Sequence, residues 1–559
     1  MPDIRNNECL SLGDALFLYL EREGMPLNVA SVSVFEGIIP LQLCRDFVES
    51  KIPLIPRYRQ RVVMPVFNIG VPTWQYDRRF DIRNHIREIT LKHGTEQEFR
   101  KEAAKILSVN MDRSRPLWDI TLLRGLKGDR TGAVIRMHHS LADGISGVSL
   151  LNVLMDASPE SPAIPLKKPK FRMPPERDSA SALVDGFITS CFTAVHGVLT
   201  AQAEILGLAQ QAVAAAGQKA QPAEAKPVIN QTFQQPTPSL NDITRILTEL
   251  ATPADRLPFN RICRGPQTFG WTDISIAEIT AVKEACNAKL NDVVLTVVTS
   301  ALRKYAELHD VRTKGRQLRV VVPVSVWGKD DTGEMGNRIT FLPVSLPMDI
   351  DDDRQLLATV SDRMTFLKSA HVAEIVGVTG SLLGAIPGSL QALVGPIASQ
   401  LPLSVCNVIC TNVPGPRTAL HFIGHKMLSC YPYVPIGGEM GMNCAVLTYN
   451  GTAHFGFTGD VHAIPDLQRL PEFLTESFAE LKKSVGVSSK PKRNRAPRKP
   501  RSKKRSTPPA PIRIVTSKMK EITEVPAIAP TAMGEEPRAL GAAVGSSQLQ
   551  AIASGTTDV

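Results

Sequence analysis

Residues 134–144 read VIRMHHSLADG, and this stretch decides which fold the sequence specifies. The apolar run is typical of a strand, and it leads directly into two histidines. Asp143 and Gly144 follow after three more residues, and Val148–Leu154 then has the apolar pattern of a helix face. This order of strand, loop and helix predicts an α/β fold in which the paired histidines lie where a strand ends.

The two histidines are expected to have different environments, because adjacent strand residues point to opposite faces. His138 and His139 should therefore not act on the same bound atom, and one faces a pocket while the other faces the interior. Asp143 is expected to fold back in the turn, and Gly144 permits a positive φ. A histidine is the usual group for removing a hydroxyl proton near neutral pH, so the pair predicts general-base chemistry.

Other kinds of catalytic site fit the spacing less well. Neighbouring strand histidines diverge, H-E-x-x-H is absent, and Cys406 and Cys410 have no partner pair, so no metal site is expected. The segment Gly144–Gly147 places its second glycine one residue too early for the G-x-S-x-G turn of serine hydrolases. No glycine-rich dinucleotide or phosphate-binding fingerprint is evident, so no bound cofactor is expected.

The chain of 559 residues is long enough for two core-forming domains. The composition predicts four parts, which are an N-terminal α/β unit (1–157), a linker with helical content (158–254), a second α/β unit (255–487) and a disordered tail (488–559). Apolar runs predict strands at Val29–Phe35, Ala133–Met137, Leu318–Val326, Thr340–Leu346 and Ala453–Gly459, and helices at Glu96–Leu107, Lys289–Leu302 and, in the linker, Ser181–Ala220.

The net charge of +10 comes from one place, since residues 490–505 (KPKRNRAPRKPRSKKR) carry ten Lys or Arg and no acid. Such a cluster attracts anionic lipid headgroups, and we favour a membrane or lipid-inclusion surface as its partner over a merely solubilising tail or nucleic acid. The uncharged run 375–416 is long but interrupted by prolines, which leaves open an interfacial lipid-binding segment or buried helices. Nine scattered cysteines and an N-terminus without a signal-peptide pattern predict a cytoplasmic protein with reduced thiols.

At this point the sequence resembles the bacterial wax ester synthase/diacylglycerol acyltransferases, within the superfamily of chloramphenicol acetyltransferase and condensation domains. The H-H-x-x-x-D-G string marks the superfamily. The segments that resemble this branch are Ser11–Phe17, Met25–Val29, Arg115–Trp118, Asn291–Asp292, Gly336–Arg338 and Asn412–Pro416, and the resemblance runs in order from about residue 11 to 480.

The resemblance implies two chloramphenicol-acetyltransferase-like lobes with a tunnel between them. It also implies transfer of an acyl group from acyl-CoA, as co-substrate, to diacylglycerol or a fatty alcohol. The second histidine of the family motif is the general base, which corresponds to His139, with His138, Asp143 and Gly144 in support. Asp143 would form an internal ion pair with an arginine.

Further residues are candidates for supporting roles. Thr411 and Asn412, interpreted as part of a turn in TNVPGP, are candidate oxyanion donors, with ordinary turn residues as the alternative. The motif Pro116, Leu117 and Trp118 is expected to pack in a core, and Asn291 with Asp292 to open a helix or to line the tunnel. Two other functions remain open at this stage, a transferase that uses a carrier protein and a lipid-inclusion protein without enzymatic activity.

Overall fold

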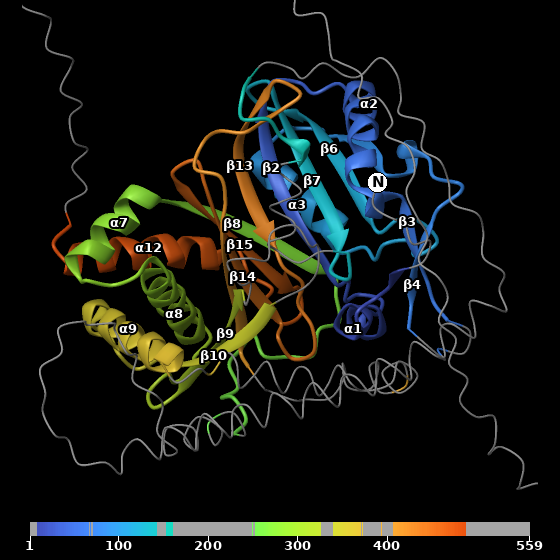
Figure 1. Cartoon of the computed structure of the whole chain (residues 1–559). Helices are drawn as coiled ribbons and strands as arrows, with labels where there is room; N and C mark the ends of the chain where they lie inside the picture. The colour runs from blue at the N-terminus through green and yellow to red at the C-terminus, as the bar shows by residue number, and fades with distance from the viewer. Residues whose placement is uncertain are drawn as a thin grey trace, which may run out of the picture. The chain divides into compact units, whose positions relative to one another are not determined.

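Two six-stranded sheets form the centre of the computed structural model (Figure 1). The structure describes residues 8–65, 68, 71–141, 153–159, 249, 252–325, 339–369, 372, 393 and 406–487. All of them belong to the first of two units into which the chain divides, residues 1–490 and 491–559. The fold is therefore α/β, as the sequence predicts.

The first sheet carries the paired histidines. Its strands, in spatial order, are β12 (His421–Phe422), β13 (His425–Tyr433), β2 (Asn28–Glu36), β7 (Arg130–His138), β6 (Trp118–Leu126) and β5 (Ile86–Thr90). All neighbours are antiparallel except β5 and β6, which are parallel. A separate small sheet has the order β1 (Glu8–Cys9), β4 (Thr73–Tyr76) and β3 (Gln60–Val63).

The second sheet has the order β10 (Ile339–Pro347), β9 (Gln317–Ser325), β11 (Val408–Pro414), β14 (Met442–Tyr449), β15 (Thr452–Asp460) and β8 (Gln267–Ser275). The interior strand β11 is parallel to both of its neighbours, and the other pairs are antiparallel. The uncharged run predicted as a lipid-binding segment or buried helices is thus, over Val408–Pro414, an interior strand. The remainder of that run falls almost entirely outside the described residues.

The first sheet contains strands from both halves of the chain. The strand β13 pairs with β2 over Tyr433↔Ala30 to Met427↔Phe35, although these residues are far apart in sequence. Side chains also connect the two sheets, since the Tyr431 hydroxyl on β13 donates a 3.0 Å hydrogen bond to Asp273 on β8. The two lobes are therefore joined by strand exchange as well as by surface contact.

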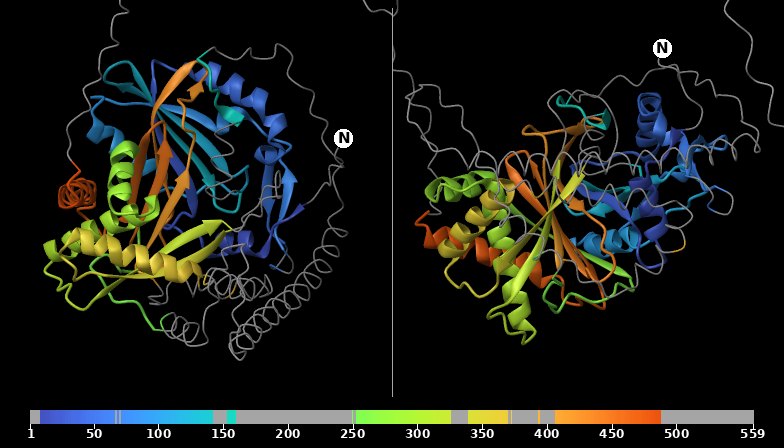
Figure 2. Two further views of the ribbon diagram at one scale, coloured as in Figure 1. Left: turned by 60° about the vertical axis from the view of Figure 1, so that its left-hand side comes forward. Right: turned by 60° about the horizontal axis from the view of Figure 1, so that its bottom comes forward.

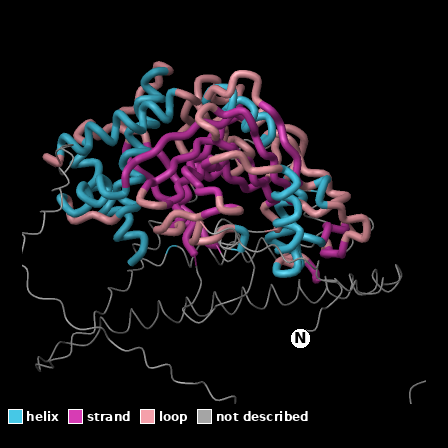
Figure 3. The backbone as a smooth tube through the Cα atoms, turned by 90° about the horizontal axis from the view of Figure 1, so that it is seen from above, coloured by secondary structure: helices cyan, strands magenta, loops and turns pink. Residues whose placement is uncertain are grey.

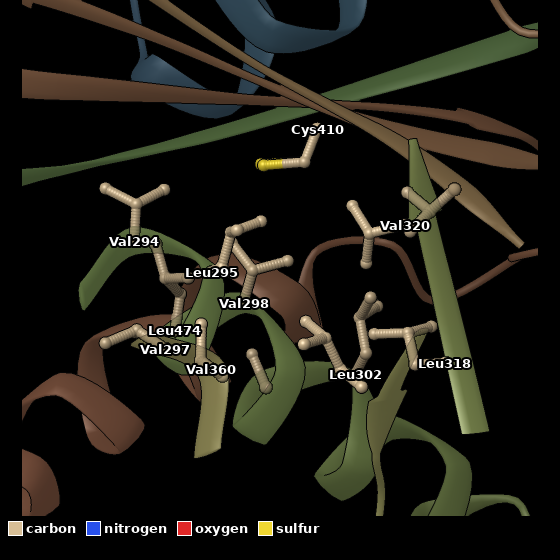
Figure 4. Packing of buried hydrophobic residues seen from close by; sticks show 14 of the residues in the cluster. Val294, Leu295, Val297, Val298, Leu302, Leu318, Val320, Val360, Cys410 and Leu474 are labelled. Atoms are coloured by element: carbon tan, nitrogen blue, oxygen red, sulfur yellow. The ribbon is translucent and has the colours of Figure 1, made fainter. Parts of the chain in front are cut away.

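Helices flank the two sheets (Figures 2 and 3). The α-helices are α1 (Leu12–Leu20), α2 (Leu41–Lys51), α3 (Glu96–Leu107), α7 (Ile276–Ala285), α8 (Leu290–Leu308), α9 (Asp353–Ser369) and α12 (Arg469–Ser484), and the 3₁₀ helices are η1 (Ile52–Leu54), η2 (Pro56–Arg59) and η4 (Ile82–Asn84). Buried side chains of α2 and α3 pack against opposite faces of the first sheet. Those of α8, α9 and α12 pack against the second sheet, where Cys410 of β11 faces the valines of α8 (Figure 4).

Most of the predicted elements are confirmed. The helix α3 has the predicted ends, and its N-cap Thr95 accepts a hydrogen bond from the Glu98 N–H. The helix predicted to end at Leu302 continues to Leu308, because good helix formers follow and Tyr305 is buried in the core. The predicted linker helix and the tail lie outside the described residues. Within the described part of the chain, no helix is long and apolar enough to cross a membrane.

Candidate functional site

The backbone at the end of β7 is held from two sides. The His138 N–H donates to the carbonyl of Leu117 at 3.0 Å, and the His139 N–H donates to the carbonyl of Leu27 at 2.9 Å. Leu27 directly precedes β2, so both histidines are fixed relative to the neighbouring strands. The strand ends at His138, as predicted from the sequence.

His138 is fully buried, and its ring is oriented by Ser140. The Ser140 hydroxyl oxygen lies 2.7 Å from the His138 Nδ1, and the Ser140 backbone N–H donates to the same nitrogen at 3.1 Å. Because a backbone N–H can only donate, Nδ1 is the acceptor and the ring proton of the neutral imidazole is on Nε2. Burial, with smaller effects of Arg113 and His139, holds the pKa of His138 well below its usual value. His138 is therefore neutral near pH 7, and its contacts hold the ring in the protein interior.

A partly buried ion pair lies next to His138. The Glu21 side chain, 2% exposed, accepts from Arg113 at 2.8 Å and from the Leu27 N–H at 3.2 Å. Its Oε1 also lies 3.6 Å from the His138 Nε2, which is beyond hydrogen-bond distance. Arg113 in turn donates to the carbonyl of Leu18 in α1 at 2.7 Å. Glu21 thus connects the end of α1 to the start of β2 and lies beside the end of β7.

His139 differs from its neighbour in being only half-buried. Its ring stacks on the ring of Phe17 in α1, with centroids 4.0 Å apart and planes inclined by 11°. Leu141, two residues later, and Val413 of β11 both pack against the core of the first sheet. His139 is therefore the partly exposed histidine of the pair.

Thr411 and Asn412 lie in a strand, and their predicted placement in a turn is wrong. Both belong to β11 and pair in register with β14, because the strand continues up to Pro414 before the chain turns. The Asn412 side-chain amide donates to the Asn291 side chain at the start of α8. Thr411 points to the opposite face, the same face as Val413. The two side chains therefore cannot both reach one oxyanion.

Asn291 and Asp292 lie in the first turn of α8, whose N-cap is Lys289. Asp292 is buried, and its Oδ2 accepts a 2.9 Å hydrogen bond from the Lys289 backbone N–H. A carboxylate at this position satisfies a helix N-terminus and interacts favourably with the helix dipole. The geometry gives Asp292 a capping role, and it links Asn291 to β11 through Asn412.

The motif Pro116–Trp118 leads into β6 and is buried in the core beside the first sheet. Leu117 is fully buried against α1, and its carbonyl accepts the His138 N–H. Trp118 stacks between Tyr58 and His85, and its indole N–H donates to the Tyr58 carbonyl at 2.9 Å. The motif therefore supports the end of β7 by packing.

Asp143 and Gly144 lie outside the described residues. Among the residues that are described, no cluster of three or more His, Cys, Asp or Glu could hold a metal ion. Phe17, Glu21 and Arg113 were not predicted as site residues. The sequence carries a signal for two of them, because Phe17 and Glu21 are four residues apart and a helix would place them one turn apart. In the structure the Glu21 N–H bonds to the Phe17 carbonyl.

Comparison with known proteins agrees with this architecture. The family model of the wax ester synthase/diacylglycerol acyltransferase catalytic domain matches residues 10–294, and that of the WS/DGAT C-terminal domain matches residues 335–482. A Mycobacterium tuberculosis protein with the provisional name diacylglycerol O-acyltransferase is 28% identical over 489 residues, which cover 85% of this chain and 90% of that protein. A second M. tuberculosis protein with such a name, tgs1, is 24% identical over 485 residues, or 86% of this chain and 96% of that protein.

Solved structures share the fold. The wax ester synthase/diacylglycerol acyltransferase of Marinobacter aquaeolei VT8 superposes with a TM-score of 0.57 at 23% identity, covering 86% of this chain and all of that one. The first condensation domain of the calcium-dependent antibiotic synthetase gives a TM-score of 0.50 at 15% identity, covering 86% and 97%. The fold is thus the two-lobed fold that the sequence resemblance implied. Together with the two family models, which cover most of the described residues, this places the chain in the wax ester synthase/diacylglycerol acyltransferase family of acyltransferases.

Proposed function

We propose that this protein transfers a long-chain acyl group from acyl-CoA to diacylglycerol, a fatty alcohol or both, with His139 as the general base. The observation that supports this proposal is the asymmetry of the paired histidines. His138 is buried with its Nδ1 occupied by Ser140, whereas His139 is only half-buried and stacks on Phe17. The partial exposure of the second imidazole supports its assignment as the base.

The proposed reaction is a direct transfer within a complex of enzyme, acyl-CoA and acceptor. His139 accepts the hydroxyl proton of the acceptor as its oxygen attacks the thioester carbonyl. The tetrahedral intermediate then expels the CoA thiolate, and the imidazolium returns the proton to the sulfur. The ester and free CoA leave, and His139 is neutral again. We expect the two substrates to reach His139 from opposite ends of a tunnel between the lobes, without a further cofactor.

The negative charge on the tetrahedral intermediate requires hydrogen-bond donors. Of the two candidates, the Thr411 hydroxyl is on the face of β11 that carries Val413, toward the first sheet. The Asn412 amide is on the opposite face and donates to Asn291. We therefore retain Thr411 as the candidate donor, and we propose that Asn412 supports it by fixing β11 to α8.

The test is the transfer of labelled palmitate from palmitoyl-CoA to diacylglycerol and, separately, to hexadecanol, with separation of the neutral lipids. We expect His139→Ala to lower the rate by about 10²- to 10⁴-fold, because general-base assistance is lost. His462→Ala, which removes an exposed histidine, should leave the rate unchanged. A folded His139→Ala protein with near wild-type transfer would refute the assignment.

The same assay decides between donors. A palmitoyl carrier protein replaces palmitoyl-CoA in a parallel reaction, and turnover with the carrier alone would favour a condensation-type transferase. Lipid binding with no turnover of any donor would instead favour a lipid-inclusion protein. We further propose that the basic segment 490–505 brings the cytoplasmic enzyme to an anionic membrane or lipid-inclusion surface, where its lipid acceptors are found.

A further inference from the structure

Phe17 lies on the half-buried side of α1. The other aromatic and aliphatic side chains of α1 that are buried, Leu18 and Tyr19, pack with Ala15 in the core around Trp74 and Leu117. Phe17 belongs to none of the hydrophobic clusters formed by the described residues. It is half-buried, and its ring lies against His139 instead. Core packing therefore does not explain an aromatic residue at this position.

The position of Phe17 is fixed from both ends of its helix. At the start of α1, the Ser11 hydroxyl accepts from the Asp14 N–H at 3.0 Å, which satisfies the N-terminus. At the end, the Phe17 carbonyl accepts the Glu21 N–H at 3.1 Å, and the Glu21 carboxylate is held by Arg113 and the Leu27 N–H. Leu27 also holds the backbone of His139. The helix and the histidine are thus parts of one hydrogen-bonded assembly.

We infer that Phe17 is a positioning residue that sets the ring plane of His139 and stabilises its protonated form. This inference rests on the proposed function. A stack with centroids 4.0 Å apart and an inclination of 11° limits rotation about the bond between Cβ and the ring. The imidazole nitrogen that accepts the proton is therefore held in one direction.

The same contact favours the charged state that forms during the reaction. A cation over the face of an aromatic ring is attracted by the ring quadrupole, and the attraction is greater where water is excluded. His139 is neutral before the acceptor attacks and is a cation while the tetrahedral intermediate exists. Phe17 therefore stabilises the intermediate more than the substrate complex, and its loss should lower kcat more than it changes KM.

The experiment compares three substitutions of one ring. Phe17→Leu removes the aromatic face but keeps an apolar side chain, whereas Phe17→Tyr and Phe17→Trp retain a face. A matched control is Phe80→Leu, because Phe80 also stacks on a histidine, His85, with centroids 5.1 Å apart and an inclination of 20°. Steady-state transfer from palmitoyl-CoA gives kcat and KM, and thermal unfolding gives the stability of each variant.

We expect Phe17→Leu to lower kcat roughly tenfold with KM for palmitoyl-CoA within about twofold, and the tyrosine or tryptophan variant to retain at least about half of the wild-type kcat. Phe80→Leu should lower the Tm and leave kcat of the folded protein unchanged. A Phe17→Leu enzyme with wild-type kcat, or a loss that neither aromatic variant restores, would overturn the inference. If the wild-type protein is an active transferase but the variants do not show these changes in kcat, only the inference fails and the proposed function stands. A wild-type protein that is inactive with every donor would refute the inference and the proposed function together.

A second readout does not depend on turnover. In protein labelled at the ε1 carbon of histidine, the His139 resonance is identified by its absence from His139→Ala. The ring current of Phe17 should place this resonance upfield, and Phe17→Leu should move it downfield by a few tenths of a ppm or more, while Phe80→Leu should not. An unchanged His139 resonance in Phe17→Leu would show that the two rings do not stack in solution, and the inference would fail.

Discussion

The adjacent residues His138 and His139 illustrate how one bond along a strand separates two chemical environments. His138 is enclosed between Glu21, Arg113 and Ser140, and burial keeps it neutral. His139, one residue later, stacks on Phe17 and is partly exposed. The same side-chain chemistry thus supplies a structural group on one face and a candidate base on the other.

The lowered pKa of His138 makes the stability of the protein depend on pH. In the unfolded chain this histidine takes up a proton below about pH 6.5, whereas in the folded protein it stays neutral to a lower pH. Below pH 6.5 the unfolded state therefore binds more protons, and the free energy of unfolding should fall as the pH falls, by at most about 1.4 kcal/mol per pH unit for this group. Above pH 6.5 its contribution is fully present.

Denaturant unfolding between pH 5 and 7 measures this effect. We expect His138→Gln to reduce the slope of the free energy of unfolding against pH below pH 6.5 by about one proton. His85, whose pKa is also lowered by burial, contributes in the same direction, and His85→Gln gives an independent comparison. A His138→Gln slope identical to that of the wild type would contradict the buried neutral state.

The element that links the second lobe to the site is α8. Its first turn contains Asp292, which caps the helix, and Asn291, which bonds to Asn412 of β11. The body of the helix fills the core under β11, where Val294, Val298 and Cys410 lie together (Figure 4). A change at Asn291 therefore affects β11 through the hydrogen bond to Asn412. Asp292, in contrast, stabilises the helix itself.

We predict that Asp292→Ala lowers the free energy of unfolding by about 1 kcal/mol and leaves kcat within about twofold of wild type. The loss arises because the Lys289 N–H no longer has its carboxylate partner. Glu278→Ala is the control, because this first-turn residue of α7 makes only a partly exposed ion pair with Lys482, and its loss should cost about 0.5 kcal/mol or less. A stable Asp292→Ala protein that has lost its activity would instead assign Asp292 a direct role in catalysis.

The elements were predictable where one local pattern dominates. The strands β2, β7 and β15 and the helix α3 follow from their own apolar spacing and caps, and the divergence of the two histidines follows from strand geometry. The second half of β11, from Thr411, is expected to be a turn because Pro414 and Pro416 suggest one, although strands also end at proline. The contacts of Phe17, Glu21 and Arg113 join distant segments, and no local pattern specifies which distant residues meet.

At the scale of the whole molecule, the net charge is concentrated in one segment of the sequence. The segment 490–505 carries ten basic residues and no acid, which equals the net charge of +10, so the remainder of the chain is close to neutral. A concentrated basic segment on an otherwise nearly neutral chain can draw the protein to an anionic surface. Attraction of about 1 kcal/mol per basic residue near the surface falls with added salt.

We predict that deletion of residues 488–559 weakens binding to liposomes that contain anionic lipid at low salt, and that replacement of the ten basic residues by Gln has the same effect. Binding to neutral liposomes should be equally weak for all three proteins. Cosedimentation with vesicles at two salt concentrations gives the measurement. Equal binding of the wild type and both variants to anionic vesicles would exclude the segment from membrane attachment.

The pairing of β13 with β2 also has a consequence for biosynthesis. While the ribosome is still translating the second half, the partner of β2 does not yet exist, and the nascent first sheet has an open edge on that side. Open strand edges are templates for wrong association. The strand that bears the two histidines, β7, is the other neighbour of β2, so the sheet that carries them is completed only after residue 433 has emerged. Maturation of the candidate site is thus postponed until most of the described residues have been made, a period in which chaperone protection of that edge would have its greatest value.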